Sequence, residues 1–221
     1  GVVYVRTRGT NQRGEIVMDY VRWVMVRKRD AEAAAPETVV PELKRALTVA
    51  DLAIPAGLTF AKYDFAQAGE PHRLGDYAVG EVIDHVDGVT IEEAEHMMAT
   101  RLWQNTAKVH FDATFREDGR RLIYGGHVIS MARALSFNGL ANAQMIVGLN
   151  GGAHANPCFS GDTVRAWSEV LDTAETSAPN VGAIRLRLVA TKGAAGALKN
   201  AEGKYLPEVL LDLDYWALMP I

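Results

Sequence analysis

The sequence predicts an α+β fold in which an antiparallel sheet wraps one buried helix. Residues 126–140 are apolar on nearly every side, which is typical of a helix enclosed by the rest of its domain. Strands are predicted after it at 143–155, 162–173, 182–191 and 208–219, and residues 182–191 alternate apolar and polar side chains as a half-buried strand does. Helices followed by a run of neighbouring strands indicate the α+β class.

The first and last hairpins of the chain resemble each other. Residues 16–26 read IVMDYVRWVMV and residues 209–219 read VLLDLDYWALM, so an acid, an aromatic residue, a Trp and a Met recur in similar order. This indicates an internal repeat, with chance resemblance as the alternative because strand composition is limited. The chain is therefore expected to begin with the end of one module and to contain a second one complete.

Three segments are predicted on this basis. Residues 1–30 are expected to be the last hairpin of an incomplete first module. Residues 31–75 are expected to be a linker, since they are charged, rich in Ala and interrupted by Pro36 and Pro41. Residues 76–221 are expected to form the complete second module.

A helix is predicted over residues 90–104, ahead of the buried one. Thr90 occupies the N-cap position, and Glu93 stands where the acid of a capping box would be. One face of this helix is apolar; it carries Ile91, Ala94, Met97, Met98 and Leu102.

Composition excludes several classes of protein. The 221 residues are 48% hydrophobic and 23% charged, an ordinary globular balance. Lys and Arg total 23 against 27 for Asp and Glu, a net charge of −4. Because nucleic-acid binding calls for basic surfaces, we expect no nucleic-acid partner. No apolar stretch is long enough to span a bilayer, so no membrane partner is expected either.

The single cysteine, Cys158, permits no intramolecular disulfide, which fits the reducing cytoplasm. We therefore expect a cytoplasmic protein without a signal peptide. Cys158 is interpreted as a small buried apolar residue. No metal site is predicted.

The loop QNTAKVHFD, residues 104–112, carries the chemistry. It places Asn105 five residues before His110, with Asp112 two residues further on. Downstream, YGGH opens the buried helix at residues 124–127. The first N–H groups of a helix have no partner within it and lie at its positive end. We therefore predict that the N–H groups of Gly126 and His127 bind an anionic oxygen, unless the glycines serve only close packing.

The chain resembles the MaoC-like, (R)-specific enoyl-CoA hydratase family of the hotdog superfamily. The resemblance rests on a loop ending in His110, the glycine step before the central helix, and the turn PCFSGDT at residues 157–163. It implies a hotdog fold, and the present chain would be the C-terminal part of a double hotdog that lacks most of its first half. It also implies a hydratase-dehydratase acting on a branched dicarboxylic acyl-CoA thioester, with coenzyme A as part of the substrate and no other cofactor.

The resemblance makes His110 the proton-transfer group, and the ordinary pKa of imidazole suits that task. The family's catalytic Asp falls on Asn105, which as an amide can orient water but takes no proton at neutral pH. Three replacements for the missing carboxylate stay open: Asp112, Glu169, or a residue of the absent half.

Other polar residues receive weaker roles. Asp112, Asn150 and His154 are possible substrate contacts, and the last two flank a Gly-Gly step. Asp162 is expected to form a turn. A homodimer is expected because a lone module leaves an open sheet edge. The alternative function is a non-catalytic acyl-CoA-binding or scaffolding module, and a thioesterase is disfavoured because Asn105 offers no carboxylate.

Overall fold

A computed structural model describes residues 1–194 and 196–221 as two compact units, Gly1–Lys44 and Arg45–Ile221. The first unit contains an antiparallel hairpin of β1 (Val2–Thr10) and β2 (Ile16–Met25), joined by a tight turn. The hairpin predicted for residues 1–27 is therefore present. Its assignment to a first module, and the domain boundaries at 30 and 75, stay predictions.

The repeat extends from sequence to side-chain geometry. Arg6 lies opposite Val21, and its guanidinium binds the carboxylate of Asp19 through two hydrogen bonds of 2.8 and 2.7 Å. In the last hairpin Arg185 lies opposite Trp216 and binds Asp214 in the same way, at 2.9 and 2.6 Å. In each hairpin the arginine therefore binds the Asp that lies two residues before its cross-strand partner. This shared diagonal pairing supports the internal repeat.

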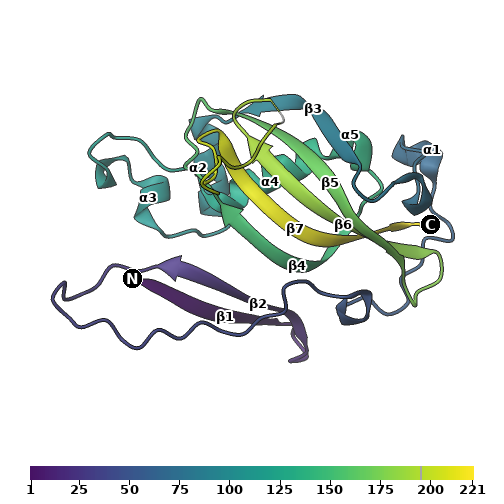
Figure 1. The fold of residues 1–221 in the computed structure, drawn as a ribbon, viewed down its shortest axis with the longest axis horizontal. Coiled ribbons are helices and arrows are strands. Elements are labelled where there is room, and N and C mark those ends of the chain that lie inside the picture. Colours follow the sequence, from purple (N-terminus) through teal and green to yellow (C-terminus); the bar gives the residue numbers. More distant parts are fainter. Residues whose placement is uncertain (195) are drawn as a thin grey trace. The chain divides into compact units, whose positions relative to one another are not determined.

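The second unit is built on an antiparallel sheet with the strand order β3-β5-β6-β7-β4. Its strands are β3 (Val82–Thr90), β4 (Met145–His154), β5 (Thr163–Glu175), β6 (Val181–Thr191) and β7 (Val209–Pro220). Its helices are α1 (Phe65–Ala68), α2 (Glu93–Leu102), α3 (Lys108–Phe111), α4 (Gly125–Leu135) and α5 (Phe137–Leu140), with single 3-10 turns at Val49–Asp51, Leu74–Asp76 and Ala113–Phe115. Figure 1 shows α4 against one face of the curved sheet, the arrangement of a hotdog fold.

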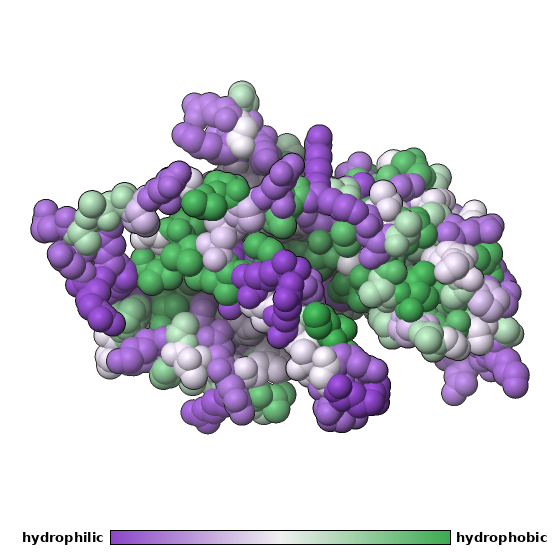
Figure 2. Space-filling view, turned by 90° about the horizontal axis from the view of Figure 1, so that it is seen from below, coloured by the Kyte–Doolittle hydropathy of each residue, from purple (hydrophilic) through white to green (hydrophobic). Residues whose placement is uncertain are grey.

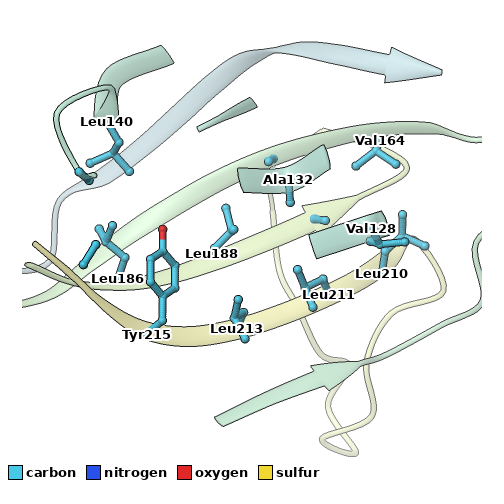
Figure 3. Packing of buried hydrophobic residues seen from close by; sticks show 14 of the residues in the cluster. Val128, Ala132, Leu140, Val164, Leu186, Leu188, Leu210, Leu211, Leu213 and Tyr215 are labelled. Atoms are coloured by element: carbon cyan, nitrogen blue, oxygen red, sulfur yellow. The ribbon is translucent and has the colours of Figure 1, made fainter. Parts of the chain in front are cut away.

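The main core lies between α4 and the sheet. Val128 and Ala132 of α4 are buried against residues of the central strands. Figure 3 shows these two side chains near Leu188 of β6 and Leu211 of β7. Cys158 belongs to the same buried cluster, as predicted, and burial raises the pKa of its thiol to about 12.

The central helix differs from its prediction in length and exposure. It starts at Gly125 and ends at Leu135, because Asn138 and Gly139 leave the helical conformation and Gly139 has a φ of +90°. Ser130 and Ala134 are exposed, so only one face of α4 is covered within this chain. The prediction that this helix is buried on nearly every side is therefore correct only for the face that packs on the sheet.

The start of α2 also differs from its prediction. Glu92 is the N-cap residue of α2 and makes no side-chain capping bond. Thr90 remains in β3, where its hydroxyl bonds that of Thr163 at 2.8 Å. Thr90, which the sequence predicted as the N-cap, therefore pairs with β5 as the last residue of β3.

Part of the segment predicted as a linker packs on the other face of the sheet. Leu52 is buried against Trp216, and Leu47 lies beside it. Trp216 donates its Nε1–H to the carbonyl of Leu47 at 3.1 Å. Asn150 accepts the N–H of Leu47 at 2.7 Å and donates to Asp214, also at 2.7 Å. Residues 47–60 thus pack on the face opposite α4, whereas Leu74 belongs to the main core.

We expect Leu188→Ala to lower the free energy of unfolding by about 2–5 kcal/mol, because it removes buried methyl groups from a packed core. Leu188 is fully buried on β6. The exposed Leu102 on α2 offers the matched control, and Leu102→Ala is expected to change stability by less than about 0.5 kcal/mol. Urea unfolding followed by circular dichroism measures both; equal losses in the two variants contradict this packing assignment.

Candidate active site

His110 is held in one orientation by the loop that follows it. Its Nδ1 lies 2.8 Å from the carbonyl oxygen of Leu122, and the N–H of Leu122 donates to the Val109 carbonyl at 3.0 Å. Because a carbonyl only accepts, Nδ1 carries the hydrogen. The neutral ring therefore has its lone pair on Nε2, which is the form that a general base requires.

Asn105 uses its side-chain oxygen within its own turn. Its Oδ1 accepts the N–H of Ala107 at 3.1 Å, and its backbone N–H donates to Thr100 at 2.9 Å. Such a turn is a common local role of asparagine. One acceptor position of the amide oxygen is thus used by the turn, and the Nδ2 group can donate to a ligand.

The N-terminus of α4 provides one of the two predicted donors. Tyr124 is the N-cap residue, and the N–H of His127 donates back to its carbonyl at 2.9 Å. The N–H of Gly126 has no intrahelical partner at this position. A Cβ on Gly126 would lie 2.6 Å from the Tyr124 ring, and one on Gly125 would lie 2.6 Å from His154 Nε2. The glycines therefore permit close packing as well as leaving an N–H group available.

A second histidine, His96, was not predicted from the sequence. It is buried on α2, and its Nε2 accepts the N–H of Tyr124 at 2.9 Å. Its ring centroid lies 6.5 Å from that of His110 and 6.0 Å from that of His127. Burial, with help from the two neighbouring histidines, lowers the pKa of His96 to about 4. His96 is therefore neutral at neutral pH and fixes the turn that leads into α4.

Glu95 places a carboxylate beside His127, and the sequence did not indicate this role for Glu95. Its Oε1 lies 3.1 Å from Nε2 of the buried His127. The other ring nitrogen, Nδ1, is buried and has no hydrogen-bond partner among residues 1–194 and 196–221. An unpartnered buried polar atom costs about 1–3 kcal/mol, so its presence needs an explanation.

Neither sequence candidate for the missing carboxylate contacts His110. Asp112 caps the turn after α3 by accepting from the hydroxyl and the N–H of Thr114 at 2.6 and 3.0 Å, and these bonds lower the pKa of its carboxyl. Glu169 lies on β5, 4.0 Å from the guanidinium of Arg187. Asp162 forms the predicted turn by accepting Phe159 N–H at 2.8 Å.

The two predicted substrate contacts on β4 have different surroundings. Asn150 bonds Leu47 and Asp214, as described above, and so joins β4 to its neighbours. His154 lies against Gly125 at the start of α4, and burial lowers the pKa of its imidazole. The structure thus brings His154, and not Asn150, to the end of the helix where the predicted donors lie.

Helix α2 could have given a sequence signal for the additional residues. His96, Ala99 and Thr100 are the buried residues of this helix, and their spacing is that of one helical face. A histidine on a buried face needs a hydrogen-bond partner. That partner, the N–H of Tyr124, lies 28 residues away, beyond what local spacing indicates.

We expect the unfolding free energy to fall by roughly 2 kcal/mol between about pH 7 and about pH 5 on account of His96. The folded pKa is about 4, below that of an unfolded histidine, so protonation favours the unfolded state. This contribution is complete above the unfolded pKa and is lost as the pH falls toward the folded one. Urea titrations at both pH values should show a smaller loss for His96→Gln, which keeps an acceptor for Tyr124 N–H; equal losses contradict the assignment.

Neither a membrane-spanning helix nor a metal-binding cluster is found in the part of the chain that the structure covers. None of its helices has the length and apolar character needed to cross a membrane. Nor do its described His, Cys, Asp and Glu side chains form a group of three that could hold a metal ion.

The antiparallel sheet packed against one face of α4 is the arrangement that defines a hotdog protein. No family model matches the chain. Over its whole length it is 73% identical to mesaconyl-CoA hydratase of Cereibacter sphaeroides and 56% identical to beta-methylmalyl-CoA dehydratase of Chloroflexus aurantiacus. The chain spans 65% and 64% of the lengths of these relatives.

Solved structures agree with this relationship. A Chloroflexus aurantiacus crystal structure described as a MaoC domain protein dehydratase matches with a TM-score of 0.93 and 55% identity, over 99% of this chain and 64% of that one. A Mycobacterium tuberculosis protein with a double hotdog fold matches with a TM-score of 0.66 and 23% identity, over 98% of this chain and 62% of that one. In sequence and in fold the chain is thus similar to a MaoC domain dehydratase.

Proposed function

We propose that this protein catalyses the reversible addition of water to the double bond of mesaconyl-CoA, which gives beta-methylmalyl-CoA. The observation that carries the proposal is the 73% identity to mesaconyl-CoA hydratase along the entire chain. The second relative is named for the reverse reaction and is 56% identical. Coenzyme A belongs to the substrate, and the proposal includes no further cofactor.

His110 is the base in this proposal. The hydrogen bond to Leu122 places the hydrogen on Nδ1, so Nε2 accepts a proton from water. As that O–H bond breaks, the water oxygen forms a bond to the β-carbon of the enoyl thioester. The electrons of the double bond move toward the thioester oxygen, which becomes an enolate.

The N-terminus of α4 stabilises this enolate. The Gly126 N–H lies at the positive end of the helix, where a donor to a developing negative charge is most effective. When the enolate returns to the thioester, the imidazolium of His110 gives its proton to the α-carbon. The sum of these steps is one water added, with His110 neutral again.

We also propose that the protein is cytoplasmic and works as a homodimer. β3 and β4 are the edges of the sheet within the described residues. On β4 the apolar side chains Met145, Ile146 and Leu149 are exposed. Figure 2 shows hydrophobic areas, in green, between hydrophilic side chains on one face of the molecule. Open edges with such side chains are usually covered.

A homodimer should bury more than about 1,000 Å² of surface between its subunits. Size-exclusion chromatography with light scattering measures the mass directly. The proposal predicts twice the mass of one chain across a wide range of protein concentration. A single-chain mass throughout that range contradicts it.

The catalytic proposal is tested by ultraviolet absorbance. An enoyl thioester loses its conjugated absorbance when water adds, so absorbance should fall over time after the protein is added to mesaconyl-CoA. A non-catalytic acyl-CoA-binding module would give no such progressive change. Thioester hydrolysis would instead release a free thiol, which a thiol reagent detects.

A further inference from the structure

We propose that the Glu95–His127 pair supplies the second hydrogen-bond acceptor for the reacting water. This inference rests on the proposed hydration of an enoyl thioester. His127 Nδ1 is the atom that contacts the water, and Glu95 is a positioning residue that acts through His127. The pair thereby takes over the water-holding part of the carboxylate that is absent at Asn105.

The bond between the two side chains decides which nitrogen of His127 can accept. Glu95 Oε1 lies 3.1 Å from His127 Nε2. A carboxylate only accepts hydrogen bonds, so Nε2 carries the hydrogen and the neutral ring has its lone pair on Nδ1. That atom is buried and has no partner among the described residues, so a ligand is needed to supply the donor.

His127 lies beside the proposed oxyanion donor and shares a neighbour, His96, with the proposed base. His127 belongs to the first turn of α4, next to Gly126. Its ring lies 6.0 Å from that of His96, which in turn lies 6.5 Å from that of His110. His127 is buried, with only 6% of its side chain exposed. A donor bound to Nδ1 is therefore enclosed at the end of the helix that receives the thioester oxygen.

The proposal assigns this acceptor to His127 and not to Asn105. Its side-chain oxygen already accepts the N–H of Ala107 at 3.1 Å. Water has two O–H groups, and a base takes only one of them. In our proposal His110 Nε2 receives the proton of one, while His127 Nδ1 accepts a hydrogen bond from the other and exchanges no proton. In the reverse direction the same atom accepts from the hydroxyl group of the hydrated thioester.

Two substitutions of His127 separate the two ring nitrogens. In His127→Asn, the amide oxygen stands at the place of Nδ1, so an acceptor for water remains while the bond to Glu95 is lost. In His127→Gln, the amide nitrogen stands at the place of Nε2, so the bond to Glu95 remains while the acceptor at Nδ1 is lost. A purely structural role for His127 favours the second variant, and a water-holding role favours the first.

The experiment measures kcat and KM for hydration of mesaconyl-CoA by the full chain, with the melting temperature of each variant. We expect His127→Gln to lower kcat about tenfold to a hundredfold with KM within about twofold, and His127→Asn to retain clearly more activity. Equal kcat losses that follow the loss of melting temperature overturn the inference, as does a wild-type kcat in His127→Gln.

Glu95→Gln keeps the assay decisive if a His127 variant does not fold. A glutamine amide is uncharged and can donate to Nε2 as well as accept from it, so the hydrogen is no longer fixed on Nε2 and the acceptor at Nδ1 is weakened. We expect a kcat lower by about threefold to tenfold with an unchanged melting temperature. Glu92→Gln, at an exposed position on the same helix, is the matched control and should equal wild type. A wild-type kcat in Glu95→Gln overturns the inference, whereas an inactive wild-type protein overturns the proposed function itself.

Discussion

His110→Ala is expected to lower the rate of mesaconyl-CoA hydration by about a hundredfold to ten-thousandfold, the usual contribution of a positioned proton-transfer group. The side chain is half-buried, and its Nδ1 is occupied by the Leu122 carbonyl at 2.8 Å. Alanine removes Nε2, the atom that accepts the proton from water. The loss should appear in kcat, because the thioester oxygen is held elsewhere, at the N-terminus of α4.

A histidine away from the site provides the control. His72 is exposed and contacts Glu70 instead of the residues around α4. His72→Ala should therefore retain the wild-type rate. Steady-state kinetics for both variants, with melting temperatures, separate lost chemistry from lost stability. A wild-type rate in His110→Ala would end the assignment of the base.

Asn105→Asp is expected to raise KM by about tenfold to thirtyfold, which corresponds to about 1.4–2 kcal/mol of repulsion. The turn itself should persist, because a carboxylate accepts the N–H of Ala107 as well as the amide oxygen does. The change thus adds a negative charge with little change of shape. The proposed substrate carries a carboxylate beyond its thioester, and a nearby aspartate opposes it.

Salt and an alanine variant identify the cause of such an effect. Added salt screens charges, so the KM of Asn105→Asp should approach that of the wild type as ionic strength rises. Asn105→Ala should have a smaller effect, with no comparable salt dependence. Full activity in Asn105→Asp, with only a shifted pH profile, would instead mean that Asn105 holds water in place of the family's aspartate.

The strands were predictable because their signals are local. Alternation along residues 1–27 and 182–219 predicts two hairpins, and the structure confirms them as β1–β2 and β6–β7. The similar order of acid, aromatic residue and Trp also indicated the repeat. The diagonal bonds Arg6–Asp19 and Arg185–Asp214 required the register of each hairpin, which sequence alone does not give.

Helix ends were less predictable because tertiary pairing competes with local signals. Thr90 is a good N-cap residue, yet it pairs with Thr163 across two strands. The apolar composition of residues 126–140 does not show that the chain leaves the helix at Asn138 and Gly139. Residues 47–60 carry several apolar side chains, but the surface that these cover, around Trp216, lies far along the chain and is not indicated by local sequence.

Some residues of the candidate site could be predicted from the sequence, and others became evident only in the structure. His110 and the glycines before α4 follow from resemblance and from helix geometry. His96 and Glu95 were missed because their partners are distant in sequence, 28 residues for His96 and Tyr124, and 32 for Glu95 and His127. Asn150 stays a predicted substrate contact, and its two hydrogen-bond partners, Leu47 and Asp214, are too distant in sequence to be indicated by spacing.

The central claim, addition of water to an enoyl thioester by His110, is tested most directly in water labelled with heavy oxygen. Mass spectrometry of the thioester after reaction with mesaconyl-CoA follows the label. We predict a product heavier than the substrate by one labelled water, with the thioester intact, and almost no such product with His110→Ala. An unchanged thioester mass with the wild-type protein, or label found only in a free acid released from coenzyme A, would contradict the claim.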